Sequence, residues 1–164
     1  MLGWRNFFKG IGPMSLYLGN TDKRERFHFD AFLCHNSLAR KQVSRLASVL
    51  EGRGLAVWYD AWHLAPGKPW QGELERIISR IGSALVLVGE DGVGPWQTLE
   101  MRSFLSESVR REIPVIPVLL PGTGSIPVLP LFLKELMWVD LRQGFRKSNI
   151  DRLIWGITGK KPNE

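Results

Sequence analysis

Trp96 and Glu100 stand four residues apart directly after an apolar run, and this pair suits chemistry on a sugar. The run at residues 83–89 reads as a buried strand, and Pro95 fits the first position of a helix. Trp96 and Glu100 would then rise side by side from a loop at the carboxyl end of the strand. A carboxylate stabilises positive charge on a ribose, so the pair predicts a ribosyl substrate. In isolation, an acid in a first helical turn and a tryptophan at a helix start have structural roles more often.

The composition is that of one globular domain that needs neither a disulfide nor a metal ion to stay folded. A chain of 164 residues buries roughly 70% of its unfolded surface on folding. The single cysteine, Cys34, excludes an internal disulfide, and His28, His35 and His63 lack the paired spacing of a zinc site. No apolar stretch approaches the ~20 residues of a membrane span. We therefore expect a soluble, cytoplasmic protein without a bound metal.

The net charge of +6 is unevenly distributed along the chain. Residues 1–26 carry a net charge of +3, residues 27–140 carry −1, and residues 141–164 carry +4. A protein that reads nucleic acid usually carries its positive stripe on the folded face. Since the excess falls in the two tails, the sequence predicts no direct, sequence-specific nucleic-acid partner.

Short apolar runs alternate with amphipathic segments from residue 27 onward, which is typical of a parallel sheet covered by helices. We predict an α/β fold: a flavodoxin-like, doubly wound parallel five-stranded sheet with helices on both faces. Pro114 and Pro117 each remove a backbone donor and place the fourth strand near the edge of the sheet. The expected strands are residues 27–34, 55–59, 84–88, 113–120 and 137–141.

Five helices are expected between and after these strands, each with an apolar stripe or a capping residue. Ser37 would cap the first of them. Residues 131–135 would form only a short helix. The stripes of the other four are Val43, Leu46, Ala47 and Leu50; Leu74, Ile77, Ile78 and Ile81; Met101, Phe104, Leu105 and Ser108; and Ile150, Leu153, Ile154 and Ile157.

A ligand crevice is expected where the strand order reverses, beyond the carboxyl ends of strands one and three. Residues 34–37 and 89–100 follow those two strands, and the loop at residues 60–69 follows strand two at the same rim. His35 and Asn36 suit either the binding of ligand phosphates or the turn into the helix, whereas Asp60 suits a cap or turn at the strand end better than a binding role. Trp62 could serve as a lid or as a subunit contact. The residues expected to bind substrate are Trp96, His35, Asn36, Ser37, Asp60 and Trp62.

Several segments together resemble the TIR domain, and the likeness is closest to bacterial TIR proteins that cleave NAD. It covers about residues 27–158, with the segments in the right order and spacing. They are Phe-Asp-Ala-Phe-Leu-Cys-His-Asn-Ser at residues 29–37, Trp-Tyr-Asp at 58–60, Leu-Ala-Pro-Gly at 64–67 with Trp70, Gly-Pro-Trp at 94–96 with Glu100, and Ile-Pro-Val-Leu at 116–119.

This resemblance implies roles for particular residues. Enzymatic TIR proteins cleave the nicotinamide glycosidic bond of NAD with a glutamate one turn beyond a tryptophan, which implies that Glu100 is catalytic and that Trp96 contacts the substrate. NAD would be a substrate, and no cofactor is expected. The Pro-Gly loop implies assembly into homo-oligomers through Leu64, Pro66 and Gly67. Ala65 replaces an acidic residue of some NAD-cleaving relatives, and His35-Asn36 replaces a more polar segment.

The leading hypothesis is an NAD glycohydrolase or ADP-ribosyl cyclase in bacterial antiphage defence or as a toxin, activated by self-assembly or by a partner. A non-catalytic TIR interaction module is the main alternative, and nucleoside deoxyribosyl transfer on a similar fold is a third. The spacing at residues 92–94 is not that of a dehydrogenase fingerprint.

Residues 1–26 form a basic, aromatic arm ahead of the domain at residues 27–158, and residues 159–164 form a C-terminal tail. Trp4, Phe7, Phe8 and Ile11 share one helical face, which suits either an arm folded back on the domain or a helix that binds a partner or a membrane surface. The chain could also be part of a longer effector whose sensing domain is connected through this arm.

Overall fold

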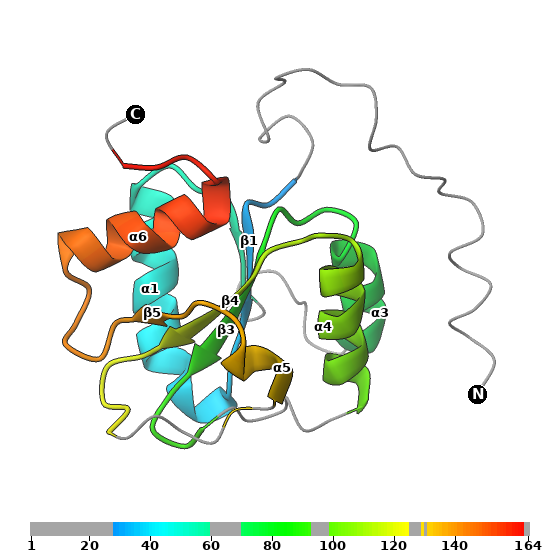
Figure 1. Ribbon diagram of the computed structural model, residues 1–164, viewed down its shortest axis with the longest axis horizontal. Coiled ribbons are helices and arrows are strands. Elements are labelled where there is room, and N and C mark those ends of the chain that lie inside the picture. Colours follow the sequence, from blue (N-terminus) through cyan, green and yellow to red (C-terminus); the bar gives the residue numbers. More distant parts are fainter. Residues whose placement is uncertain (1–27, 60–69, 93–98, 125–128, 130, 163–164) are drawn as a thin grey trace.

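The computed structural model describes residues 28–59, 70–92, 99–124, 129 and 131–162. Five parallel strands form one sheet with the order β2-β1-β3-β4-β5 (Figure 1). This confirms the predicted α/β class and the flavodoxin-like order. The strands are β1 (Ala31–Cys34), β2 (Val57–Trp58), β3 (Ala84–Val88), β4 (Val115–Leu119) and β5 (Val139–Asp140).

Helices cover both faces of the sheet, because both faces are apolar. The helices α1 (Arg40–Gly52) and α6 (Lys147–Thr158) lie on one face, and α3 (Trp70–Ile77) and α4 (Leu99–Arg110) lie on the other (Figure 1). Along β3, Leu85 and Leu87 pack toward α1 and α6, whereas Val86 and Val88 pack toward α3 and α4. A parallel strand buried on both faces reads as a continuous apolar run, as this one does.

Three of the predicted stripes are found where expected, although Ile154 is only partly buried and the side chain of Met101 lies outside the described ones. The side chains of Val43, Leu46, Ala47 and Leu50 on α1 are buried, as are those of Ile150, Leu153 and Ile157 on α6 and of Phe104, Leu105 and Ser108 on α4. The short helix α5 spans Leu131–Lys134. α3 ends at Ile77, so Ile78 and Ile81 are buried just beyond it.

Only β3 has the predicted bounds, and the other four strands are shorter than predicted. β1 begins at Ala31 because the preceding residues bond differently: Phe29 forms an isolated bridge with Ile81, and Asp30 turns its carboxylate to the backbone of Ala56. The N–H of Ala56 donates to Asp30 Oδ2 at 2.8 Å. The aspartate of the Phe-Asp motif therefore holds the start of β2, at the end of the sheet opposite the expected crevice.

Pro117, the one proline within β4, leaves the sheet intact because of where its missing donor faces, and Pro114 precedes the strand. Leu120 donates its N–H to Val88 O on the β3 side, and Leu119 O accepts from Leu141 N–H on the β5 side, both at 2.8 Å. Backbone groups alternate between the two neighbours along a parallel strand, so Pro117 faces β5, one residue ahead of the first β4–β5 pair, Val118 and Val139. β4 lies next to the edge strand, as the prolines predicted.

The prediction that Ser37 caps the first helix is wrong. A 3₁₀ turn, η2 (Ser37–Ala39), precedes α1, whose N-cap residue is Ala39, without a side-chain cap bond. Asn36 acts instead: its Oδ1 accepts the N–H of Leu38 at 3.1 Å. Asn36 is the stronger turn former here because its carbonyl reaches the backbone two residues on.

No helix in the described part of the chain is long and apolar enough to cross a membrane.

Candidate functional site

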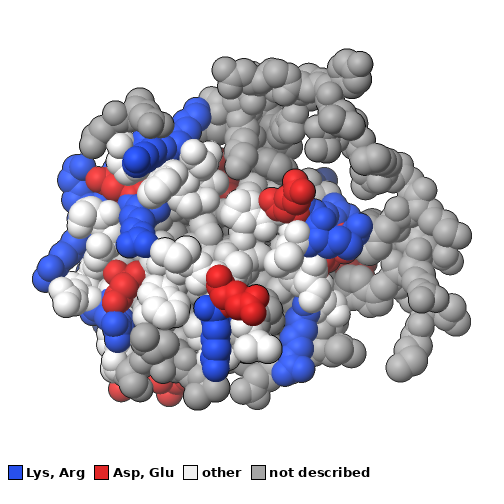
Figure 2. Space-filling model, viewed as in Figure 1, with Lys and Arg blue, Asp and Glu red and all other residues white. Residues whose placement is uncertain are grey.

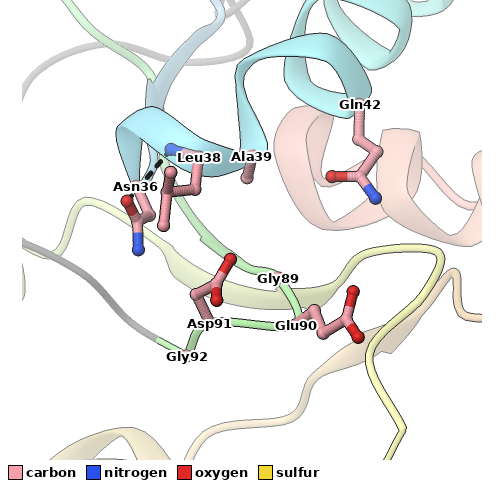
Figure 3. Close-up of a pocket in the computed structure, with 8 residues that line it drawn as sticks. All are labelled: Asn36, Leu38, Ala39, Gln42, Gly89, Glu90, Asp91 and Gly92. Atoms are coloured by element: carbon pink, nitrogen blue, oxygen red, sulfur yellow. Dashed lines mark hydrogen bonds between the residues drawn. The ribbon is translucent and has the colours of Figure 1, made fainter.

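A polar hollow of about 90 Å³ opens between the carboxyl ends of β1 and β3 (Figure 3). One wall comes from the turn into α1 and from α1 itself, and the other comes from the turn that follows β3. This is the switch point of the sheet, where ligands of doubly wound folds bind. The lining residues are Asn36, Leu38, Ala39, Gln42, Gly89, Glu90, Asp91 and Gly92.

Two glycines shape the wall that follows β3. A Cβ at Gly89 would lie 3.3 Å from the Cβ of Ala39, so the absence of a side chain lets η2 and the end of β3 approach closely. Gly92 has a φ of 79°, in the left-handed region that glycine adopts without strain. The N–H of Gly92 donates to Gly89 O at 3.0 Å and closes a tight turn. This turn holds Glu90 and Asp91 at the mouth of the hollow.

Asn36 forms the turn that its sequence position suggested, and it also lines the hollow. Its Oδ1 is engaged with the N–H of Leu38, and Figure 3 shows its amide nitrogen pointing away from that turn. Asn36 thus places an N–H donor group at the hollow.

His35 does not contribute to the hollow. Its ring lies 5.1 Å, centroid to centroid, from that of the buried Tyr59, and the Tyr59 hydroxyl donates to Arg40 O at 3.3 Å. His35 is half-buried and does not line the hollow. Its packing against the end of β2 fits the structural interpretation better than the substrate-binding one.

Gln42 joins the hollow to the neighbouring loop. Its Nε2 donates to Pro121 O at 2.8 Å, which ties α1 to the loop that follows β4. Figure 3 shows the amide oxygen of Gln42 turned toward the other lining residues. This bond orients the amide so that an acceptor faces the hollow.

The hollow is rich in acceptors. Asp91 turns its carboxylate toward η2, and Glu90 lies on the side of Gln42 (Figure 3). No lysine or arginine is among the lining residues that the structure describes. Carboxylates favour hydroxyl and amide donors and repel phosphate groups. The hollow therefore suits the sugar or carboxamide part of a ligand rather than a pyrophosphate.

Sequence reasoning missed Gln42, Glu90 and Asp91 as lining residues. Glu90 and Asp91 carried a usable signal, because two acids directly after a buried strand stand at the rim that was expected to bind a ligand. Gln42 gave no such signal, since its orientation depends on the carbonyl of Pro121, which is 79 residues away.

The other predicted site residues are only partly covered by the structure. Glu100 is the second residue of α4, and Ser37 is the first residue of η2. The remaining predicted residues, which include the expected assembly loop, lie outside the described residues: Trp96, Asp60, Trp62, Leu64, Pro66 and Gly67.

Cys34 is the last residue of β1. The side chain is buried and the thiol is free. Burial raises the pKa of this thiol well above its usual value, which keeps it neutral and unreactive. In the described segments, no group of three or more His, Cys, Asp or Glu residues could hold a metal ion.

Thr123 fixes the loop that follows β4 against the end of β3. Its side chain is 5% exposed, and its hydroxyl donates to Val88 O at 3.0 Å. We expect Thr123→Val to lower the free energy of unfolding by about 1 kcal/mol, since Val88 O keeps its bond from Leu120. Urea unfolding measures this change. The exposed Ser79→Ala is the control, and equal stability of Thr123→Val and wild type would contradict the prediction.

Comparisons with known proteins agree with this architecture. Residues 31–154 match a family model described as a TIR domain. The TIR domain of the Toll-related receptor TRR-2 from Hydra magnipapillata is 17% identical, with a TM-score of 0.57, and the match covers 77% of this chain and 92% of that one. No curated protein sequence matches the chain.

Two structures of a metazoan TIR-STING receptor from C. gigas are also similar. The one in complex with 2',3'-cGAMP is 22% identical, with a TM-score of 0.68, and the match covers 83% of this chain and 41% of that one. The other is 16% identical, with a TM-score of 0.63, and the match covers 90% and 44%. The chain spans less than half the length of either receptor chain.

The strand order and the hollow at its switch point define the class, a flavodoxin-like α/β domain. The family match covers most of the chain, and the chain belongs to the TIR domain family.

Proposed function

We propose that this TIR domain cleaves NAD at the bond between nicotinamide and ribose, as a glycohydrolase or ADP-ribosyl cyclase. NAD is the substrate, and no separate cofactor takes part. The activity belongs to bacterial antiphage defence or to a toxin, in the cytoplasm, and is switched on by self-assembly or by a partner.

The observation that carries this proposal is the acceptor-rich hollow at the switch point. The chain continues from the same end of β3 into α4. Residues 93–98 alone join Gly92, at the rim of the hollow, to α4, whose second residue is Glu100. Membership of a family with NAD-cleaving enzymes adds support.

The chemistry needs little beyond a well-placed carboxylate. Nicotinamide leaves as a neutral molecule from a cationic ring, so the main barrier is the positive charge that builds on the ribose. In the proposal, the Glu100 carboxylate stabilises that charge and Trp96 packs against the substrate and excludes water. Asn36, Gln42 and Asp91 hold the hydroxyl and amide groups of the substrate by hydrogen bonds.

The Asp91 carboxylate gives a prediction on substrate binding. A hydrogen bond to a charged group contributes enough that Asp91→Asn should raise KM for NAD about tenfold. The kcat should change much less, because Asp91 acts in both the bound and the transition state. Steady-state kinetics measure both constants, with the exposed Glu75→Gln on α3 as the control. A lower KM for Asp91→Asn would instead place the pyrophosphate at the hollow.

The test of the proposed function is to incubate the concentrated protein with NAD and to follow free nicotinamide and ADP-ribose products by chromatography. Wild-type protein should release nicotinamide, and Glu100→Gln should not. Negligible release by both proteins, in a sample that light scattering shows to be assembled, would overturn the proposal.

A second candidate is a TIR module that assembles without catalysis. Leu131, the first residue of α5, is 75% exposed, and Met137, which follows α5, is 78% exposed. Large exposed apolar side chains favour contact surfaces. The proposed homo-oligomer would use such a surface together with the loop at residues 60–69. Assembly without release of nicotinamide would favour this candidate.

A further inference from the structure

A basic surface with one exposed tryptophan covers α6 and the segment that follows it, which we call the α6 basic face. Figure 2 shows blue side chains over this part of the molecule, with few red ones. In the fully described stretch at residues 146–162, none of the exposed residues is acidic. The face comprises Arg146, Lys147, Ser148, Arg152, Trp155, Gly156, Gly159, Lys160, Lys161 and Pro162.

The face belongs to the folded domain. The sequence predicted a positive excess in a tail at residues 141–164 but also a closing helix within that range, and the structure shows the helix: α6 packs on the sheet through Ile150, Leu153 and Ile157. The positive charge at residues 146–152 therefore lies on the folded surface, which is where proteins that bind nucleic acid usually carry it.

The one acid of this stretch is already paired. Asp151 accepts hydrogen bonds from Lys147 Nζ, at 2.7 Å, and from Arg53, the residue that follows α1. The hydrogen bond from Lys147, with that from Arg53 second, lowers the pKa of Asp151, so it stays ionised at neutral pH. The pairing adds Arg53 to the edge of the face, whose net charge is strongly positive.

Trp155 and the end of α6 are held in place. Gly159 has a φ of 73° and donates its N–H to Trp155 O at 2.7 Å, which ends the helix. The chain then turns so that Lys161 Nζ lies 5.8 Å from the centroid of the Trp155 ring. Trp155 is 42% exposed, so it gives an aromatic surface in the middle of the positive charges.

We propose that the α6 basic face binds single-stranded nucleic acid without sequence preference. Lysine and arginine side chains along a helix neutralise successive phosphates, and an exposed aromatic ring accepts a stacked base of any kind. The exposed side chains of the face combine both features and contain no carboxylate that would repel the strand. Such binding depends on charge and stacking and does not read the base sequence.

Two other occupants fit the face less well. A lipid surface needs an exposed apolar stripe, but the stripe of α6 is buried against the sheet and only Trp155 remains for insertion. A second copy needs a matching acidic face, and residues 27–140 carry a net charge of only −1. A strand of phosphates matches the positive charges of the face and requires neither an exposed apolar stripe nor an acidic protein surface.

The test measures the fluorescence anisotropy of a labelled 20-nucleotide oligo-dT with the full chain at two salt concentrations. Lys160→Glu/Lys161→Glu should weaken binding at least about tenfold and make the plot of log K against log salt shallower by about 1.4, which corresponds to two phosphate contacts. Trp155→Ala should weaken it about fivefold or more, through lost stacking.

The matched control is Arg76→Glu/Arg80→Glu, which removes the same charge from two exposed positions near the end of α3. This variant should bind nearly as tightly as wild type. Equal losses in both double variants would show that only bulk charge matters and would overturn the proposal. So would tighter binding to phosphatidylserine vesicles than to the oligonucleotide, or unchanged binding by Lys160→Glu/Lys161→Glu, whose positions lie beyond α6 and leave folding intact.

Discussion

Replacing Glu100 with glutamine is expected to lower kcat for the proposed release of nicotinamide from NAD by about 100-fold or more, because the transition state would lose a preorganised charge. The substitution keeps the shape and the hydrogen-bonding capacity of the side chain and removes only the negative charge. The charge is needed when the ribose becomes cationic, so kcat falls much further than the affinity for NAD. Chromatography of nicotinamide under single-turnover and steady-state conditions separates these two effects.

A structural role of Glu100 makes a different prediction, and the same variant separates the two. Glu100 is the second residue of α4, where an acid stabilises a helix through its dipole by typically 0.3 to 1 kcal/mol. The Glu100→Gln protein should therefore be folded in the absence of denaturant, and urea titration should give it a slightly lower free energy of unfolding than wild type. Glu75→Gln on α3 should keep full activity. A folded Glu100→Gln protein with wild-type turnover would remove Glu100 from the mechanism.

The fold could be predicted from the sequence because its signals are local. Apolar runs such as residues 84–88 are as long as the strand itself, and stripes such as the one on α1 repeat with the helical period. The ends of β1 and β2 could not be predicted in this way. They depend on the bond between Asp30 and Ala56, which joins residues 26 apart.

The candidate site could be predicted less completely, for a related reason. Its position at the switch point follows from strand order, which alternation of strands and helices predicts. The direction of each side chain does not follow from strand order. Asn36 and His35 are adjacent, yet Asn36 lines the hollow and His35 packs on Tyr59. Gln42 reaches the hollow through a bond to Pro121. Contacts between distant segments decide these directions, and no local pattern encodes them.

Replacing Leu85 with alanine lowers the free energy of unfolding by about 2 to 5 kcal/mol, since it leaves a cavity in the centre of the sheet. Leu85 is fully buried on β3, between Leu33 of β1 and Ile116 of β4. Its side chain belongs to the core cluster under α1 and α6, so those helices cannot refill the space without leaving their other contacts.

This loss is a large share of the 5 to 15 kcal/mol that holds a typical domain folded. Urea unfolding followed by circular dichroism measures it, and Val109→Ala is the control. Val109 is 53% exposed on α4, so its truncation should change stability by no more than about 0.5 kcal/mol. If the two variants lost equal stability, Leu85 would not lie at the centre of the core, and the β1-β3-β4 arrangement that positions the hollow would be wrong. If Leu85→Ala alone is strongly destabilised, the strand that ends at Gly89 is the rigid support on which Glu90 and Asp91 depend.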